Sequence, residues 1–232
     1  MARLPRLVLP NLPHHILQTG NNGELVFRDA EDFQRFLGWL KDSAREFKVA
    51  VHAYVLMPDH LHLLATPSTV EGLAQTMQRV GRYYVPWFNA KNKRRGSLFQ
   101  GRFKTSLIEA GRYFMACSRF IESNPVRSGL AAEPGDYPWS SYAHHAGMVQ
   151  SSLITDHALY WALGNTPFQR EAAYIELSRP TLNQAEMAML DASVLKGWPL
   201  GSDVFKAELQ HRAKRQVLPA KRGRPFKIKP TT

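Results

Sequence analysis

A β-hairpin over residues 49–66 is the feature that most constrains the fold of this chain. Residues 49–57 form an apolar run that predicts one strand, Pro58-Asp59 predicts a turn, and residues 60–66 predict the returning strand. Such a hairpin has to belong to a larger sheet, because two strands alone are only marginally stable in water. The rest of the chain must therefore supply further strands and the helices that cover them.

The elements around this hairpin indicate the fold class. Capping residues, apolar periodicity and Gly/Pro punctuation predict strands at 14–19 and 105–109, and helices at 30–47, 70–89 and 111–122. The order β-α-β-β-α-β-α is typical of an α+β fold, a ferredoxin-like or RRM-like split βαβ sandwich with helices on one face of the sheet. We expect three parts: a chemical domain at 1–130, a loop-rich and helical extension at 131–210, and a flexible basic tail at 211–232.

The chain is strongly basic. Its 232 residues include 30 Lys and Arg against 19 Asp and Glu, which gives a formal net charge of +11. This balance indicates a polyanionic partner, with nucleic acid first and an acidic membrane surface second. The single cysteine, Cys117, excludes a disulfide framework and a multi-cysteine zinc module. No apolar run reaches the roughly 18 residues of a membrane span and no signal-peptide pattern opens the chain, so we expect a cytoplasmic protein.

The positive charge is concentrated in two places. Eight basic residues and no acidic ones follow Glu208. In this tail, Arg222 and Arg224 flank a glycine, and such a stretch can lie in an AT-rich minor groove; the alternative is a tail that contacts phosphates nonspecifically. The second cluster is interleaved with aromatic side chains, a composition that suits single-stranded DNA. It consists of Lys91, Lys93, Arg94, Arg95, Arg102 and Lys104.

Two histidines of the predicted hairpin are candidate metal ligands. Residues two apart on a strand share a face, so His60 and His62 point the same way while Leu61 and Leu63 point into the core. Each imidazole can offer one neutral nitrogen to a divalent cation. A His-X-His triplet also arises by chance, and two half-exposed strand histidines are the alternative.

A tyrosine in the first turn of the predicted helix 111–122 is a candidate nucleophile. The phenol of Tyr113 is a poor nucleophile at neutral pH, because it titrates near 10. A metal that polarises a phosphate makes its attack feasible, and the product is a covalent phosphotyrosine. The alternatives are an ordinary half-buried aromatic at position 113, with Tyr83 or Tyr84 as the nucleophile instead.

Four collinear segments carry a family resemblance. They are residues 20–22, 52–64, 98–104 and 119–130, and the likeness continues through residues 137–142. With these segments the chain resembles the single-tyrosine HUH transposases of the IS200/IS605 type, and most closely the REP-associated tyrosine transposases of bacteria.

The resemblance implies an enzyme and its site. The implied activity is that of an Mg²⁺- or Mn²⁺-dependent single-stranded DNA endonuclease and strand transferase that acts on REP-type hairpins. His60 and His62 would bind the ion, and Tyr113 would form a 5′-phosphotyrosine and leave a free 3′-OH. The internal cations would contact DNA, and a monomer is favoured over a homodimer. A protein of this kind would work in the bacterial cytoplasm, at the nucleoid when bound to DNA.

One position departs from the family pattern, and one other class of function competes. Insertion-sequence relatives have a polar third ligand one helical turn after the tyrosine, where this chain has Cys117, and a thiol suits Mg²⁺ badly. Glu122, His15 or water could complete the shell instead. The competing function is a hairpin-binding protein that does not cut, such as a transposase retained as a regulator; a binding sheet favours aromatic side chains over imidazoles.

Overall fold

The computed structural model describes residues 5–213 and 215–219. Its strands are β1 (His14–Thr19), β2 (Val49–Leu56), β3 (His60–Pro67) and β4 (Lys104–Leu107). Its helices are α1 (Ala30–Glu46), α2 (Gly72–Lys91), α3 (Ala110–Glu122), α4 (Asn124–Arg127), α5 (Tyr142–His145), α6 (Ala158–Trp161), α7 (Pro167–Ser178), α8 (Gln184–Lys196) and α9 (Asp203–Arg212), with short 3-10 turns at Asn21–Gly23 and Pro134–Asp136.

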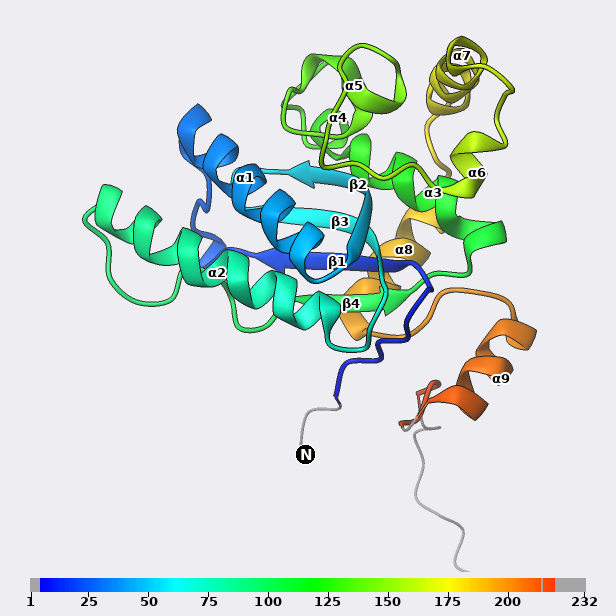
Figure 1. The fold of residues 1–232 in the computed structure, drawn as a ribbon, viewed down its shortest axis with the longest axis horizontal. Coiled ribbons are helices and arrows are strands. Elements are labelled where there is room, and N and C mark those ends of the chain that lie inside the picture. The colour runs from blue at the N-terminus through cyan, green and yellow to red at the C-terminus, as the bar shows by residue number, and fades with distance from the viewer. Residues whose placement is uncertain (1–4, 214, 220–232) are drawn as a thin grey trace, which may run out of the picture.

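The four strands form one antiparallel sheet in the order β2-β3-β1-β4 (Figure 1). The predicted α+β class is confirmed, and each predicted strand is present with ends shifted by three residues or fewer. β1 lies between β3 and β4, and its Leu17 pairs with His62 on one side and with Lys104 on the other. These three residues therefore form one row across the sheet.

Helices α1 and α2 cover one face of the sheet (Figure 1). The side chain of Asp29 starts α1 by accepting a hydrogen bond from the backbone N–H of Asp32, as a capping residue should. The buried cluster beneath these helices contains Leu61 and Leu63, as the alternation of the hairpin predicts, together with Phe36, Leu40 and Tyr84.

The expectation that helices lie on only one face of the sheet is wrong. Helices α3 and α8 pack on the opposite face, where Ala53, Val55 and Leu64 of the sheet meet Phe114, Cys117, Phe120 and Leu190. The reason is that the second face of β2 and β3 is also apolar, and an apolar face has to be covered by another layer. The fold therefore has three layers, helix–sheet–helix. In the second helical layer, α8 comes from the segment that follows residue 131.

Helix α3 lies over the sheet with a defined direction. Near its start, the ring of Phe114 contacts His52, whose Nε2 is 2.9 Å from the Thr66 hydroxyl near the end of β3. Near the end of α3, the ring of Phe120 contacts His62, close to the start of β3. The helix therefore runs antiparallel to β3, and its two ends lie over opposite ends of that strand.

The segment after residue 131 is joined to α3 by a buried polar cluster. The Glu122 carboxylate accepts hydrogen bonds from Ser141 and from Tyr174 (2.5 Å), and its Oε1 is 2.7 Å from His145 Nδ1. These partners come from α5, from the residue before it and from α7. The boundary placed at residue 130 stays a prediction, but the two sides of it share this contact.

Within residues 5–213 and 215–219, no helix is long and apolar enough to cross a membrane. Most of the predicted basic tail, including Arg222 and Arg224, lies outside the described residues.

Candidate functional site

His60 and His62 lie together at the start of β3, on the α3 face of the sheet. Their ring centroids are 5.3 Å apart. His62 is buried and His60 is partly exposed, so the pair sits at the edge of the packed layer rather than within it. This is the shared face that the strand alternation predicts.

Each histidine is oriented by a partner on its Nδ1 atom. His60 Nδ1 is 2.6 Å from the carboxylate of Asp59, and His62 Nδ1 is 2.8 Å from Nε2 of His15 on the neighbouring strand. Burial lowers the pKa of His62 well below its ordinary value and that of His15 to about 3, so these two imidazoles share a hydrogen bond as neutral rings. With Nδ1 partnered in both ligand candidates, Nε2 is the nitrogen of each ring that an ion would use.

Asn124 completes this group of side chains. Its Nδ2 is 3.1 Å from His60 Nε2, and its Oδ1 accepts a hydrogen bond from Ser128 (3.2 Å). The residue is buried just after the end of α3. Sequence reasoning treated Asn124 only as a helix stop before Pro125, although an amide four residues after Phe120 shares that residue's helix face and could have been found by this spacing.

The side chains present fit a divalent ion. Two neutral imidazoles and a carboxamide suit first-row divalent metals, and partners on the outer nitrogens of ligating histidines are the arrangement such sites use. In the described part of the chain, no group of three or more His, Cys, Asp or Glu residues is placed to hold a metal. The group described above consists of two histidines and an asparagine, and asparagine is not one of those four residue types.

Phe120 is the aromatic side chain that faces the histidines. Its ring centroid lies 5.9 Å from that of His62 and 5.8 Å from that of His15, both edge-on. The guanidinium of Arg127 covers the ring at 4.2 Å. The position over the candidate metal ligands is thus filled by a ring without a hydroxyl group.

Tyr113 is not brought beside the histidine pair. It is in the first turn of α3, seven residues before Phe120, and a helix rises about 10 Å over that distance. Helical side chains lean toward the helix N-terminus at both positions, so the lean does not bring the phenol closer to the pair. Tyr113 as the nucleophile stays a prediction, and this geometry speaks against it.

The other candidates from the sequence lie elsewhere. Cys117 is buried in the apolar layer under α3, and burial raises the pKa of its thiol, so it is no metal ligand here. The suggestion that Glu122 is the third metal ligand is wrong, because its carboxylate is bonded to Ser141, His145 and Tyr174 in the buried cluster. The hydroxyl of Tyr84 donates to the Val26 carbonyl on the other side of the sheet, as expected for a core residue.

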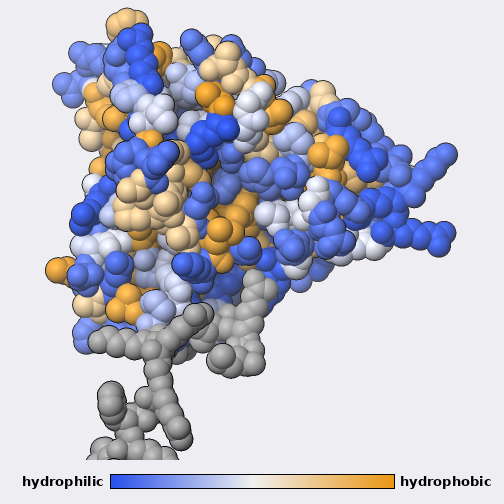
Figure 2. Space-filling model, turned by 180° about the vertical axis from the view of Figure 1, so that it is seen from behind, coloured by the Kyte–Doolittle hydropathy of each residue, from blue (hydrophilic) through white to orange (hydrophobic). Residues whose placement is uncertain are grey.

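The predicted DNA-binding cations of residues 91–95 divide into two kinds. Lys91 Nζ is 2.7 Å from Asp29 and 2.9 Å from Asp32, and Arg94 contacts Glu24, so these two charges are compensated within the protein. Lys93 and Arg95 are exposed. At this edge, beyond the end of α2, long hydrophilic side chains project from the molecular surface (Figure 2).

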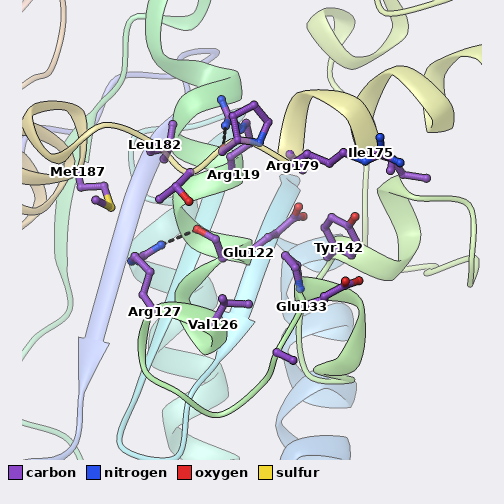
Figure 3. A pocket seen from close by; sticks show the side chains of 16 residues that line it. Arg119, Glu122, Val126, Arg127, Glu133, Tyr142, Ile175, Arg179, Leu182 and Met187 are labelled. Carbon is purple, nitrogen blue, oxygen red and sulfur yellow. Dashed lines mark hydrogen bonds between the residues drawn. The ribbon is translucent and has the colours of Figure 1, made fainter.

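A cavity of 410 Å³ opens beside the end of α3. Figure 3 shows Arg119, Arg127 and Arg179 around it, with Glu122 and Tyr142 at its wall. Because Arg127 also covers Phe120, the cavity adjoins the histidine group. Its guanidinium groups are suited to phosphate oxygens or to the plane of an unpaired base.

Comparison with known proteins identifies relatives. The family model described as "Transposase IS200 like" matches residues 9–124. A REP-associated tyrosine transposase, solved bound to a REP hairpin, shares the fold with a TM-score of 0.54 at 17% sequence identity, covering 68% of this chain and 93% of that one. A candidate transposase from Deinococcus radiodurans R1 matches with a TM-score of 0.37 at 20% identity, over 50% of this chain and 93% of that one. A comparison with curated proteins gave no significant match.

Proposed function

Because the chain belongs to the IS200-like transposase family, we propose that it binds hairpin DNA of the REP type at the sheet face that carries His60 and His62. The relative that shares this fold is bound to a REP hairpin. The observation that carries the proposal is the group formed by His60, His62 and Asn124, which lies at the surface edge of α3 next to an arginine-lined cavity.

A divalent ion, Mg²⁺ or Mn²⁺, belongs to this proposal. Nε2 of His60 and Nε2 of His62 would hold it, with Asn124 beside them. When bound, the ion would supply positive charge to a phosphate group of the DNA. Asp59 and His15 orient the two rings through Nδ1, and Arg127 places a further positive charge at Phe120.

In this arrangement the protein binds DNA without cutting it. A phosphotyrosine requires a phenol within reach of a phosphate held by the histidine group. The ring at that place is Phe120, which has no nucleophilic atom, and Tyr113 lies about 10 Å further along the helix. Binding without cleavage is the function that this geometry supports best.

The second candidate function is strand cleavage and transfer by Tyr113. Its oxygen would bond to phosphorus, the bond from phosphorus to the 3′ oxygen would break, and the proton would leave the phenol as the 3′-OH forms. Family membership supports this candidate. So does the state of the side chain, which is partly exposed and whose hydroxyl has no hydrogen-bond partner among the described residues.

One experiment separates the two functions. REP-type hairpin oligonucleotides with a single-stranded extension are incubated with the native chain in Mn²⁺, in Mg²⁺ and in chelator, and analysed on native and denaturing gels. We expect a retarded complex on the native gel and no denaturant-resistant adduct in any metal. The controls are a hairpin of scrambled sequence and the variant Tyr83→Phe, which tests the exposed tyrosine of α2 that the sequence also offers as a nucleophile.

The outcomes are distinct. An adduct that maps to Tyr113 by peptide mass, and that Tyr113→Phe abolishes, would overturn binding without cleavage and establish the second candidate. No preference for the REP-type hairpin over the scrambled one would overturn the proposal as a whole.

A further inference from the structure

A second site lies at the edge of the sheet, outside the histidine group. It is a groove of 250 Å³ between the N-terminal segment, the edge strand β4 and the end of α8. Its lining holds five cationic side chains, which we call the β4 groove cations: Arg6, Arg102, Lys104, Lys196 and Arg215. The described lining contains no Asp or Glu, so its net charge is positive.

Two of these side chains are fixed in place. Arg6 donates from Nε to the carbonyl of Phe103 (3.0 Å) and lies 3.7 Å over that ring. Arg215 donates from Nη2 to the carbonyl of Gly197 (2.7 Å), while its buried Nε finds no hydrogen-bond partner in the described part of the chain. Side chains that are already ordered lose less conformational entropy when they bind a ligand.

Four of the β4 groove cations differ from Lys91 and Arg94 in having no carboxylate partner in the described part of the chain. Within residues 5–213 and 215–219, Arg102, Lys104, Lys196 and Arg215 form no ion pair with a carboxylate. Cations gathered without carboxylates repel one another unless an anionic ligand lies between them. The groove therefore favours a polyanion, because several cations around one groove suit the successive phosphates of a nucleic acid better than a single small anion.

The strand register connects the groove to the histidine group. His62, Leu17 and Lys104 pair in one row across β3, β1 and β4, and paired residues of antiparallel strands point to the same face. Two strand spacings separate Lys104 from His62, about 10 Å. One DNA strand can therefore contact both places.

We propose that the β4 groove binds the sugar–phosphate backbone of the hairpin DNA, next to the part held at His60 and His62; this inference rests on the proposed function. Lys196 and Arg215 lie beyond residue 124, the end of the family match, so two of the groove cations come from the C-terminal segment outside that match. Phosphate contacts of this kind position DNA without reading its sequence.

The test is the salt dependence of hairpin binding. The variant Lys196→Gln with Arg215→Gln removes two groove charges; the control Lys41→Gln with Arg45→Gln removes two exposed charges from α1, on the other face of the sheet. Dissociation constants for a fluorescent REP-type hairpin are measured by anisotropy between about 50 and 200 mM KCl, because binding through phosphate contacts weakens steeply over this range of salt concentration. Thermal unfolding verifies that each variant is folded, and Lys196→Glu alone serves where the double variant is not.

We expect the groove variant to weaken binding at least about tenfold at the lowest salt, and to reduce the slope of log Kd against log salt by about one to two. The control should keep the native slope. The titration is repeated with the hairpin stem alone and with the single strand alone. The part of the DNA whose affinity falls in the groove variant is the part that lies in the groove.

The possible failures are distinguishable. If the native chain binds the hairpin and the groove variant keeps both affinity and slope, the groove inference falls and the proposed function stands. If the native chain does not bind the hairpin at any salt concentration, the proposed function falls and the inference falls with it.

Discussion

Replacing Glu122 with alanine should destabilise the whole described fold, because this carboxylate joins α3 to the segment after residue 131. It is 1% exposed, and three donors converge on it, from Ser141, His145 and Tyr174. The substitution leaves those buried groups without their acceptor. Removing one member of a buried charged network costs about 3–5 kcal/mol of unfolding free energy, a large part of the total stability of an ordinary domain.

Urea denaturation followed by circular dichroism measures this loss. Glu122→Gln retains one carbonyl acceptor and the side-chain shape, so we expect a smaller cost of about 1–3 kcal/mol. Glu176→Ala is the matched control: that residue is exposed on α7 in an ion pair with Arg179, and we expect a change of at most about 0.5 kcal/mol.

The shape of the transition carries a second result. If the segment after residue 131 folds with α3, Glu122→Ala shifts one cooperative transition. A loss below about 1 kcal/mol would refute the reasoning about the buried cluster. Two separate transitions, with only one of them shifted, would refute the coupling and support an independent domain at 1–130.

Three further predictions concern the site and its surroundings. Phe120→Tyr places a phenol beside His62, so we expect a denaturant-resistant adduct with REP-type hairpin DNA in Mn²⁺, mapped by peptide mass to position 120; hairpin binding without such an adduct would contradict the assignment of this position. His15→Phe removes the partner of His62 Nδ1, and calorimetry should show Mn²⁺ affinity lowered about 10–100-fold; an unchanged affinity would exclude a role for His15 in orienting the ligand. Burial lowers the pKa of His52 to about 4, so between about pH 6.5 and pH 4 the unfolded chain binds a proton at this residue and the folded chain does not. The free energy of unfolding is therefore highest above pH 6.5 and falls by about 3 kcal/mol toward pH 4. Urea titrations of His52→Asn should show a shallower fall.

The hairpin and the strands around it were predictable because they rest on local patterns. Alternation places Leu61 and Leu63 in the core, and the turn at 58–59 fixes where the pair begins. The second helical layer was not predictable in the same way. Whether an apolar sheet face is covered by the next helix or by a helix far along the chain depends on contacts such as Ser106 with Ser193, which no local pattern encodes.

The site shows the same division. The shared face of His60 and His62 follows from the period of a strand, and the structure has it. The placement of an aromatic residue over them does not follow from its presence on α3. Tyr113 and Phe120 are both on that helix, and only the direction of the helix across β3 decides which ring meets His62. Tertiary packing sets this direction, and the sequence does not reveal it. From the sequence, Tyr113 is therefore selected for its phenol alone.

The end of α3 is shared between the site and the segment after residue 131. Phe120 and Asn124 face the histidines, whereas Glu122, between them in sequence, points to α5 and α7. The last turn of the helix is thus held from both sides, and the side chains that face the histidines cannot move independently of the Glu122 cluster. A motion of α3 that brought Tyr113 to the histidine pair would have to slide the helix by about 10 Å and break every contact of that cluster. The buried carboxylate therefore opposes the proposed cleaving arrangement and supports the proposed binding arrangement, so the contacts of α3 with α5 and α7 bear on which of the two candidate functions the geometry favours.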